Sequence, residues 1–308
     1  MRVGVTGGNG FIGQYLIRDY GQEYDFIIPV RDKRKRSGNR TDGRYVESDF
    51  SVESLRCIFK DCNAVIHLAA KRMPKNRDPL KMADYVPNIE CAAHVFEACK
   101  DLHITNVICA STKSVWGSIG PDKKILLTET DTPYPGDEYG VSKLCVEALA
   151  DFYNRIYGMN IAIYRMAEVC GMDLTRGMVN PFWAALLNAS IEKRPIPIYG
   201  KGISGRDLIY VKDVTRALVV GLEKSNKGVF HIGSGHITTN LEIAEAFCKV
   251  FHNKSGIELH PEKEEWGQSL CLSVEKARTE LGYEAEYQLS GFVRDIKEEY
   301  NQRKMQEV

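Results

Sequence analysis

The chain has 308 residues, of which 44% are hydrophobic and 27% are charged. These ordinary globular values exclude a disordered or collagen-like chain, and the length predicts one large domain or two lobes. Because Lys plus Arg and Asp plus Glu both number 41, the net charge is zero. No general attraction to nucleic acid or to an anionic membrane is therefore expected.

Nine cysteines are scattered along the chain without a C-x-x-C pair. This pattern is typical of free thiols in a reducing compartment, and no metal site is predicted. No uninterrupted apolar run approaches about 18 residues, so no membrane-spanning helix is expected. The first six residues lead directly into a strand and a turn, without signal-peptide organisation. We therefore expect a cytoplasmic protein.

Short apolar runs alternate with longer segments of helical period, which is the pattern of a parallel sheet with crossover helices. The predicted strands are 2–6, 26–30, 44–47, 64–68, 106–110, 161–166, 208–211 and 228–232. The predicted helices are 11–20, 51–59, 79–101, 138–157 and 214–223. Pro29 is difficult to place inside a strand, since proline cannot donate to a ladder, and indicates a bulge or a strand end.

The predicted fold is therefore α/β, with a Rossmann-type doubly wound parallel sheet over residues 1–170 and a return segment at about 205–235. Residues 171–204 and 236–308 have Pro-rich connections and helices separated by few strands. We expect them to form a smaller, mostly α substrate lobe over the carboxyl ends of the parallel strands. In open α/β sheets the ligand crevice forms at that edge.

A glycine-rich turn directly follows the first predicted strand. Gly7 permits a tight turn, Gly10 lets the backbone approach a pyrophosphate, and Gly13 allows close packing of helix on strand. Phe11 and Ile12 open the following helix, whose free N–H groups favour phosphate. The turn predicts a dinucleotide site.

Arg31 and Asp32 follow the second predicted strand. An acidic side chain at this point accepts hydrogen bonds from a ribose hydroxyl, whereas an arginine accommodates a 2′-phosphate. The position of Arg31, with Lys33 and Arg34 beyond it, favours NADP over NAD. The alternative is that Arg31 begins a basic loop and that Asp32 binds the ribose.

Tyr139 and Lys143 open a predicted helix and are four residues apart on one face. A neighbouring ammonium favours the phenolate form of a tyrosine, which makes a general base suited to a sugar or alcohol hydroxyl. The pair follows a Pro-rich loop after Ser111 and Thr112, which leave the fifth predicted strand on the cofactor side.

Matches to one family run through nearly the whole chain. They are the glycine turn, residues 65–70, Asn88, residues 111–117, Tyr139 with Lys143, Arg165 with residues 169–171, residues 199–202 and 206–214, residues 230–235, and residues 276–283. Together they resemble the extended short-chain dehydrogenase/reductase family, of the NAD(P)-dependent epimerase/dehydratase type. That family comprises nucleotide-sugar epimerases, dehydratases, decarboxylases and reductases.

The resemblance implies a role for each matching residue. Tyr139 would take the proton from a sugar hydroxyl, Lys143 would bind the ribose and favour the phenolate, and Thr112 would bond the reacting oxygen. The alternative for Thr112 is a strand-end hydroxyl that only caps backbone. The cofactor would further contact Asp49, Phe50, Leu68, Ala69, Ala70, Asn88, Ser111, Met166 and Val169. Asp49 could instead only cap the next helix, Asn88 could cap a turn, and His67 is interpreted as a packed strand residue.

Lys71, Thr112, Lys113, Glu168 and Arg206 are the residues that we expect at the substrate. Lys113 stands where dehydratases of this family carry an acidic residue, which disfavours that reaction. It could neutralise a charged sugar group or face solvent. Glu168 replaces an Asn of related epimerases, and could bind hydroxyls, act as a second base or form a structural ion pair.

Arg206 matches a family arginine that contacts the nucleotide diphosphate, which suits bidentate binding. A second family arginine is missing from the acidic stretch 261–268, which puts the nucleotide handle in doubt. Trp266 in that stretch could stack on a base or pack against the lobe.

The resemblance favours a nucleotide-sugar epimerase that works through a transient keto intermediate. An NADPH-dependent reductase of a keto sugar or another carbonyl compound is the alternative, and a non-catalytic dinucleotide-sensing protein is a third. Family members commonly dimerise through the helices that correspond to 88–101 and 138–157. A homodimer with a small-molecule substrate, and without nucleic acid or membrane, is expected.

Overall fold

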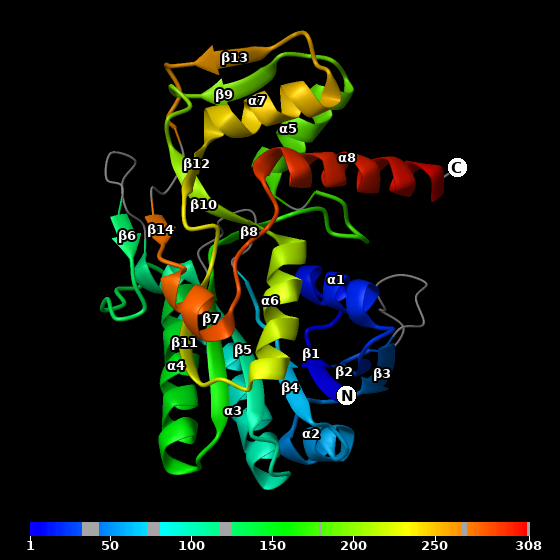
Figure 1. Ribbon diagram of the computed structural model, residues 1–308, viewed down its shortest axis with the longest axis vertical. Coiled ribbons are helices and arrows are strands. Elements are labelled where there is room, and N and C mark those ends of the chain that lie inside the picture. Colours follow the sequence, from blue (N-terminus) through cyan, green and yellow to red (C-terminus); the bar gives the residue numbers. More distant parts are fainter. Residues whose placement is uncertain (33–42, 73–80, 118–124, 179, 266–269, 307–308) are drawn as a thin grey trace.

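The computed structural model describes residues 1–32, 43–72, 81–117, 125–178, 180–265 and 270–306, and it has a larger and a smaller part (Figure 1). The larger part is built on a seven-stranded sheet in the order β11-β7-β5-β4-β1-β2-β3, with every neighbouring pair parallel. Its strands are β1 (Arg2–Thr6), β2 (Asp25–Val30), β3 (Gly43–Glu47), β4 (Ala64–His67), β5 (Asn106–Thr112), β7 (Asn160–Met166) and β11 (Gly228–Ile232). This confirms the predicted Rossmann-type α/β fold.

Helices cover both faces of this sheet. Alternate strand residues point to opposite faces, and both faces carry apolar side chains that the helices bury. The helices on one face are α1 (Phe11–Tyr20) and α6 (Val211–Lys224), and those on the other are α2 (Val52–Phe59), α3 (Val86–Asp101) and α4 (Glu138–Ile156). Ile28 of β2 packs in the buried cluster with α1 and α6, and its neighbour Ile27 packs in the cluster with α2, α3 and α4.

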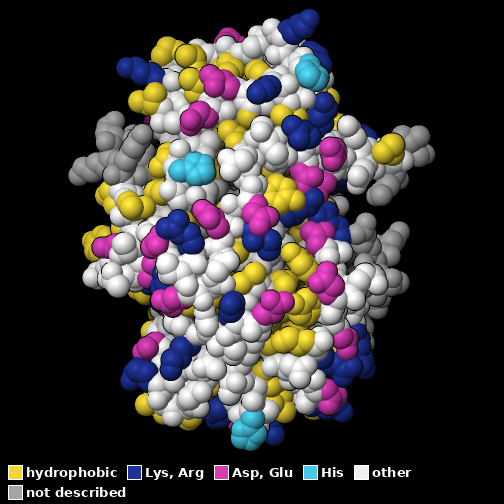
Figure 2. Space-filling view, in the orientation of Figure 1, with side chains coloured by type: hydrophobic (Ala, Val, Ile, Leu, Met, Phe, Trp, Pro, Cys, Tyr) yellow, Lys and Arg dark blue, Asp and Glu magenta, His cyan; other side chains and the backbone are white. Residues whose placement is uncertain are grey.

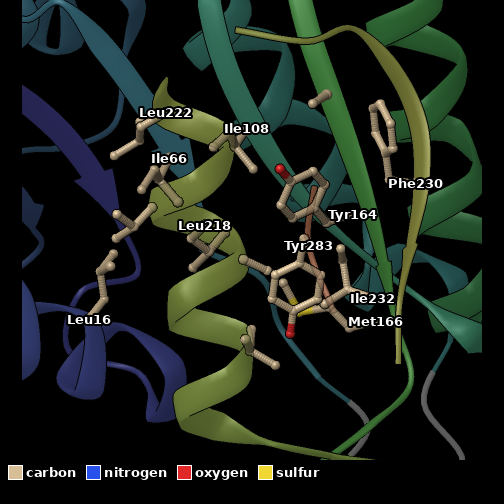
Figure 3. Packing of buried hydrophobic residues seen from close by; sticks show 14 of the residues in the cluster. Leu16, Ile66, Ile108, Tyr164, Met166, Leu218, Leu222, Phe230, Ile232 and Tyr283 are labelled. Carbon is tan, nitrogen blue, oxygen red and sulfur yellow. The ribbon is translucent and has the colours of Figure 1, made fainter. Parts of the chain in front are cut away.

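Leu218 and Leu222 of α6 face the sheet residues Ile108 and Tyr164 (Figure 3), and Gly221 of the same helix allows this close approach. A Cβ atom added to Gly221 would lie 2.1 Å from the Tyr164 hydroxyl and 2.8 Å from Ile108. Leu218 and Leu222 flank this contact in the same buried cluster. A larger residue at position 221 would therefore push the helix away from β7.

Two local features differ from the sequence-based expectation. The helix predicted over 79–101 begins at Val86, and a short 3₁₀ turn, η2 (Met82–Asp84), precedes it. Pro87 explains the start, because proline is tolerated in the first helical turn but not in the interior. Pro29 lies within β2, opposite Val46 of β3 and past Ile27, where the β1–β2 ladder ends. It therefore disrupts no β1–β2 pairing.

The smaller part contains more strands than the sequence analysis predicted. A three-stranded sheet has the order β12-β10-β8 and a two-stranded one pairs β13 with β9. The strands are β8 (Glu168–Cys170), β9 (Ile196–Tyr199), β10 (Gly205–Tyr210), β12 (Ile237–Thr239) and β13 (Ile257–His260), and the helices are α5 (Pro181–Ile191), α7 (Asn240–Phe251) and α8 (Leu289–Gln306). Trp183, Phe247 and Phe292 form the centre of its buried cluster.

One segment near the C-terminus returns to the larger part. β14 (Leu270–Leu272) pairs with β6 (Ile125–Leu127), and η4 (Ala277–Leu281) packs in the same core as α6. The division into a cofactor domain and a substrate lobe remains a prediction. The segment of β14 and η4, which was predicted in the substrate lobe, packs with the larger part.

The described surface has a mixed charge pattern. Acidic and basic side chains alternate over the face in Figure 2. None of the described helices is long and apolar enough to cross a membrane.

Candidate active site

The glycine turn between β1 and α1 forms a cradle for a diphosphate. Gly7 has a positive φ of 75°, and a Cβ there would lie 2.7 Å from the Ala69 backbone nitrogen. A Cβ at Gly10 would meet only one atom within 4 Å, the Gly7 carbonyl oxygen. No side chain caps α1 at Gly10, so its first N–H groups are available to an anion. These features fit a dinucleotide.

Gly13 and Phe11 fix the helix against its neighbours. A Cβ at Gly13 would lie 2.5 Å from the Gly8 Cα atom, and one at Gly171 would lie 3.0 Å from the Phe11 ring. The predicted residues Leu68 and Ala70 flank Ala69 directly after β4. Ile12 packs against both the cluster that contains α6 and the buried cluster of the smaller part. The turn, the end of β4 and the loop after β8 thus lie together.

Residues at the ends of β2 and β3 lie where the resemblance places the adenosine. The Arg31 guanidinium is 5.9 Å from the centre of the Phe50 ring. Asp49 accepts hydrogen bonds from the Ser51 backbone N–H and hydroxyl, and these bonds lower the pKa of its carboxyl. Ser51 itself is the N-cap of α2, so Asp49 supports the cap from outside. Lys33 and Arg34 lie outside the described residues.

The turn after Thr112 and the start of α4 meet beyond the carboxyl end of β5. The Thr112 hydroxyl accepts a hydrogen bond from Ser114 N at 3.2 Å and caps the short turn η3 (Lys113–Trp116). A Cβ at Gly140 would lie 2.4 Å from the Ser114 carbonyl oxygen, so only glycine lets α4 approach so closely. Tyr139 directly precedes this contact and is half-buried.

Asn88 connects α3 to the first turn of α4. Its amide nitrogen donates to the Ser142 hydroxyl at 3.2 Å, and its side chain exchanges two bonds with the Lys71 backbone. Ser142 in turn donates to the Tyr139 carbonyl at 2.8 Å. The Lys71 side chain forms an exposed ion pair with Asp84 at 2.9 Å. Asn88 therefore positions α4.

Lys143 is almost fully enclosed, with 3% of its surface exposed. Burial and the Lys143 charge together lower the pKa of His67 to about 3. The His67 ring is therefore neutral, and its Nδ1 atom lies 2.8 Å from the Thr6 hydroxyl. Lys143 thus lies near His67 at the end of β4, one helical turn after Tyr139.

Sequence reasoning missed Glu147, which lies one turn after Lys143. Its carboxylate accepts bonds from the Ser111 hydroxyl at 2.5 Å and from Arg165 NH2 at 2.7 Å. The Arg165 guanidinium also lies 4.6 Å from the Trp116 ring centre. The four-residue spacing from Lys143 was the available signal. Glu147 joins β5, β7, α4 and η3.

Glu168 forms ion pairs with two cations from other elements. Lys113 Nζ lies 3.6 Å from its carboxylate, and Arg206 Nη1 lies 3.2 Å from it. Burial alone would raise the pKa of the Glu168 carboxyl, but the charges of Arg206 and Lys113 outweigh this and hold the pKa below its ordinary value. Of the three alternatives for Glu168, the structure contains the ion pair.

Arg206 is held by a chain of polar contacts that sequence reasoning also missed. Its NH2 group donates to Asn240 at 2.8 Å, and the Asn240 amide lies 3.5 Å from Glu265. Glu265 accepts from the backbone N–H groups of Lys201 at 3.1 Å and Ser204 at 2.6 Å. The acidic stretch that lacks the second arginine therefore orders the loop before β10. Trp266 lies outside the described residues.

The remaining predicted residues lie close to these groups. Met166 ends β7 and pairs in register with Thr112, and Val169 of β8 pairs with Ile209 of β10. In the described part of the chain, no group of His, Cys, Asp and Glu side chains could hold a metal ion.

Comparison with known proteins identifies the family. A model of the NAD dependent epimerase/dehydratase family matches residues 3–233. The chain belongs to this family. The UDP-glucose 4-epimerase of Lacticaseibacillus casei is 26% identical over 319 residues, which cover 93% of this chain and 92% of the relative.

Solved structures agree with this membership. The UDP-N-acetylglucosamine 4-epimerase from Bacillus cereus has a TM-score of 0.82 and 27% identity, over 96% of this chain and 98% of its own. A variant of the UDP-glucuronic acid 4-epimerase from Bacillus cereus, in complex with a fluorinated UDP-sugar and NAD, has a TM-score of 0.82 and 26% identity over 99% and 100% of the two chains. The predicted family and enzyme class, an NAD(P)-dependent epimerase/dehydratase-family enzyme, are confirmed.

Proposed function

We propose that this family member is a nucleotide-sugar epimerase that inverts a sugar carbon through a transient keto intermediate. The observation that carries the proposal is the packing of α4 at Gly140 against the turn after Thr112, which supports Tyr139 and Lys143 of the same helix as the proton-transfer pair. The relatives named as epimerases of UDP-glucose, UDP-N-acetylglucosamine and UDP-glucuronic acid support a nucleotide sugar as substrate.

Three side chains would move or hold the proton of the reacting hydroxyl. A bound nicotinamide would supply the reversible hydride acceptor for the sugar carbon. Tyr139 Oη would take the hydroxyl proton and later return it, and the Lys143 ammonium would stabilise the phenolate charge. Thr112 Oγ1 would bond the reacting oxygen, in place of its present 3.3 Å contact with Ser114 Oγ.

NADP is the cofactor that we propose, with NAD as the alternative. Arg31 is exposed at the end of β2 and could approach a 2′-phosphate, while Phe50 would border the adenine. The structure of the UDP-glucuronic acid 4-epimerase variant is named as a complex with NAD. The same arginine favours the second candidate function, an NADPH-dependent reductase of a keto sugar.

The proposal also covers the oligomeric state and the location of the protein. Phe152, Ile156 and Tyr157 lie on the second half of α4 and directly after it, and are 42%, 56% and 47% exposed. Such apolar exposure supports a homodimer that buries α3 and α4, which native mass spectrometry would measure. We retain the cytoplasm as the proposed location.

The test combines cofactor retention with product analysis. Native mass spectrometry of the purified protein should show a bound dinucleotide, and proton NMR should show epimerisation of a UDP-sugar without net consumption of NADPH. Steady consumption of NADPH would favour the reductase instead.

The variant Tyr139→Phe should keep the dinucleotide and lose turnover by about 100-fold or more. Tyr134→Phe is the matched control, because Tyr134 lies on the preceding loop and is 82% exposed. Full activity of Tyr139→Phe would show that another group is the base.

A further inference from the structure

Lys113 has bonding capacity that its observed ion pair does not use. Its Nζ atom lies 3.6 Å from Glu168 Oε2, whereas a charge-assisted hydrogen bond between such groups measures about 2.7–2.9 Å. A lysine ammonium carries three N–H donors. Lys113 can therefore donate to a ligand without first breaking a tight contact.

Glu168 is held more firmly on its other side. Arg206 NH1 donates to it at 3.2 Å, and Asn240 fixes the same guanidinium at 2.8 Å. The guanidinium also lies 4.9 Å from the Phe182 ring centre. A ligand at this point therefore meets a carboxylate that is already engaged and a lysine that retains donors.

The charges that face a ligand here sum to a positive value. Lys113, Arg206 and Glu168 keep 13%, 10% and 24% of their side-chain surfaces exposed. Asp207 is fully buried, and its charge also acts on Lys113, but its oxygens are bonded to the backbone N–H groups of Ser234 and Leu272.

The next carboxylate, Glu265, is separated from Arg206 by Asn240. The partly exposed charged side chains at this point, Lys113, Arg206 and Glu168, thus carry a net charge of +1, and this balance favours an anionic substituent over an ammonium group.

On the basis of the proposed function, we propose that the sugar of the substrate carries a carboxylate on the carbon next to the reacting carbon, and that Lys113 binds it. A nucleotide-linked hexuronic acid has this chemistry at C4, since the neighbouring carbon C5 bears the carboxylate. Lys113 directly follows Thr112 and pairs with Glu168, which the resemblance places at the substrate, so the proposal requires the long lysine side chain to reach the substituent next to an oxygen bonded to Thr112. Glu168 competes with this carboxylate for the Lys113 ammonium and repels it.

The test compares kcat/KM for UDP-glucuronic acid, UDP-glucose and UDP-N-acetylglucosamine. The unaltered enzyme should prefer the uronic acid. Lys113→Met should lower kcat/KM for UDP-glucuronic acid by about 10- to 100-fold, the range of a lost bond between charged groups. Its effect on a neutral sugar should stay within about threefold. Lys60→Met is the control, because Lys60 is exposed at the end of α2.

Two results would overturn the inference: a preference for a neutral sugar, or an equal loss on all substrates in Lys113→Met. Glu168→Gln provides an independent measurement, since it removes the repulsion at nearly constant shape. It should lower KM for the uronic acid, and an increase would contradict the proposed role of Glu168. If the unaltered protein epimerised none of the three sugars, the proposed function itself would fail, and the charge inference with it.

Discussion

Replacing Glu147 with leucine would leave the Arg165 guanidinium without its counter-charge inside the protein. Both side chains are 5% exposed, and the carboxylate accepts bonds from Arg165 at 2.7 Å and Ser111 at 2.5 Å. Removing one partner of a buried ion pair costs about 3–5 kcal/mol, because the remaining charge is desolvated and unpaired. The folded-to-unfolded ratio should therefore fall by about 150- to 5,000-fold.

Urea unfolding of a double-mutant cycle measures this effect. The double variant Glu147→Leu/Arg165→Met should be more stable than Glu147→Leu alone, since it removes the stranded charge. Asp151→Asn is the control on the same helix, because the Asp151–Arg155 pair is about two-thirds exposed and its loss should cost under about 0.5 kcal/mol. A loss below about 1 kcal/mol in Glu147→Leu, or additive losses in the double variant, would refute this reasoning.

Three further predictions concern the cofactor site and pH. Gly13→Ala should weaken dinucleotide binding by about 10- to 100-fold, since its Cβ would lie 2.5 Å from backbone. Gly291→Ala, with nothing within 4 Å, should leave calorimetric affinity unchanged, and equal effects would contradict the cradle. Arg31→Ala should lower affinity for NADP by about tenfold or more and spare NAD, and equal losses would assign Arg31 elsewhere. Burial and the nearby Arg165 charge lower the pKa of His231 to about 4, whereas an unfolded histidine has a pKa of about 6.5. The unfolded chain then binds the proton first, so stability from His231 is present above pH 6.5 and falls by about 2 kcal/mol by pH 5. His231→Gln should flatten this slope in urea unfolding, and an unchanged slope would exclude His231.

The sheet and the glycine turn could be predicted because their signals are local. Central parallel strands are continuous apolar runs, and a turn that needs Gly7 at a φ of 75° is visible in a few residues. The predicted start of α3 at residue 79 was wrong because the apolar period continues upstream of Pro87. The position of Pro87 sets the first turn of the helix. The pairing of β9 with β13 joins Ile196 to Ile257, and strands so short carry too few alternations to be recognised.

The contacts that order the smaller part could not be read from any window of sequence. Glu265 occupies the stretch where the resemblance leads one to expect an arginine, and its oxygens accept N–H groups of residues 61 and 64 positions earlier. The missing cation is therefore replaced by a carboxylate that fixes the loop before β10 and, through Asn240, the arginine at position 206. A motif search records this as a lost ligand, whereas the structure shows one cation held in place by neutral and acidic partners. The reason is burial, because a guanidinium that is 10% exposed must be bonded on several sides. The partners that bond it lie far from Arg206 in the chain, and only the fold brings them to it.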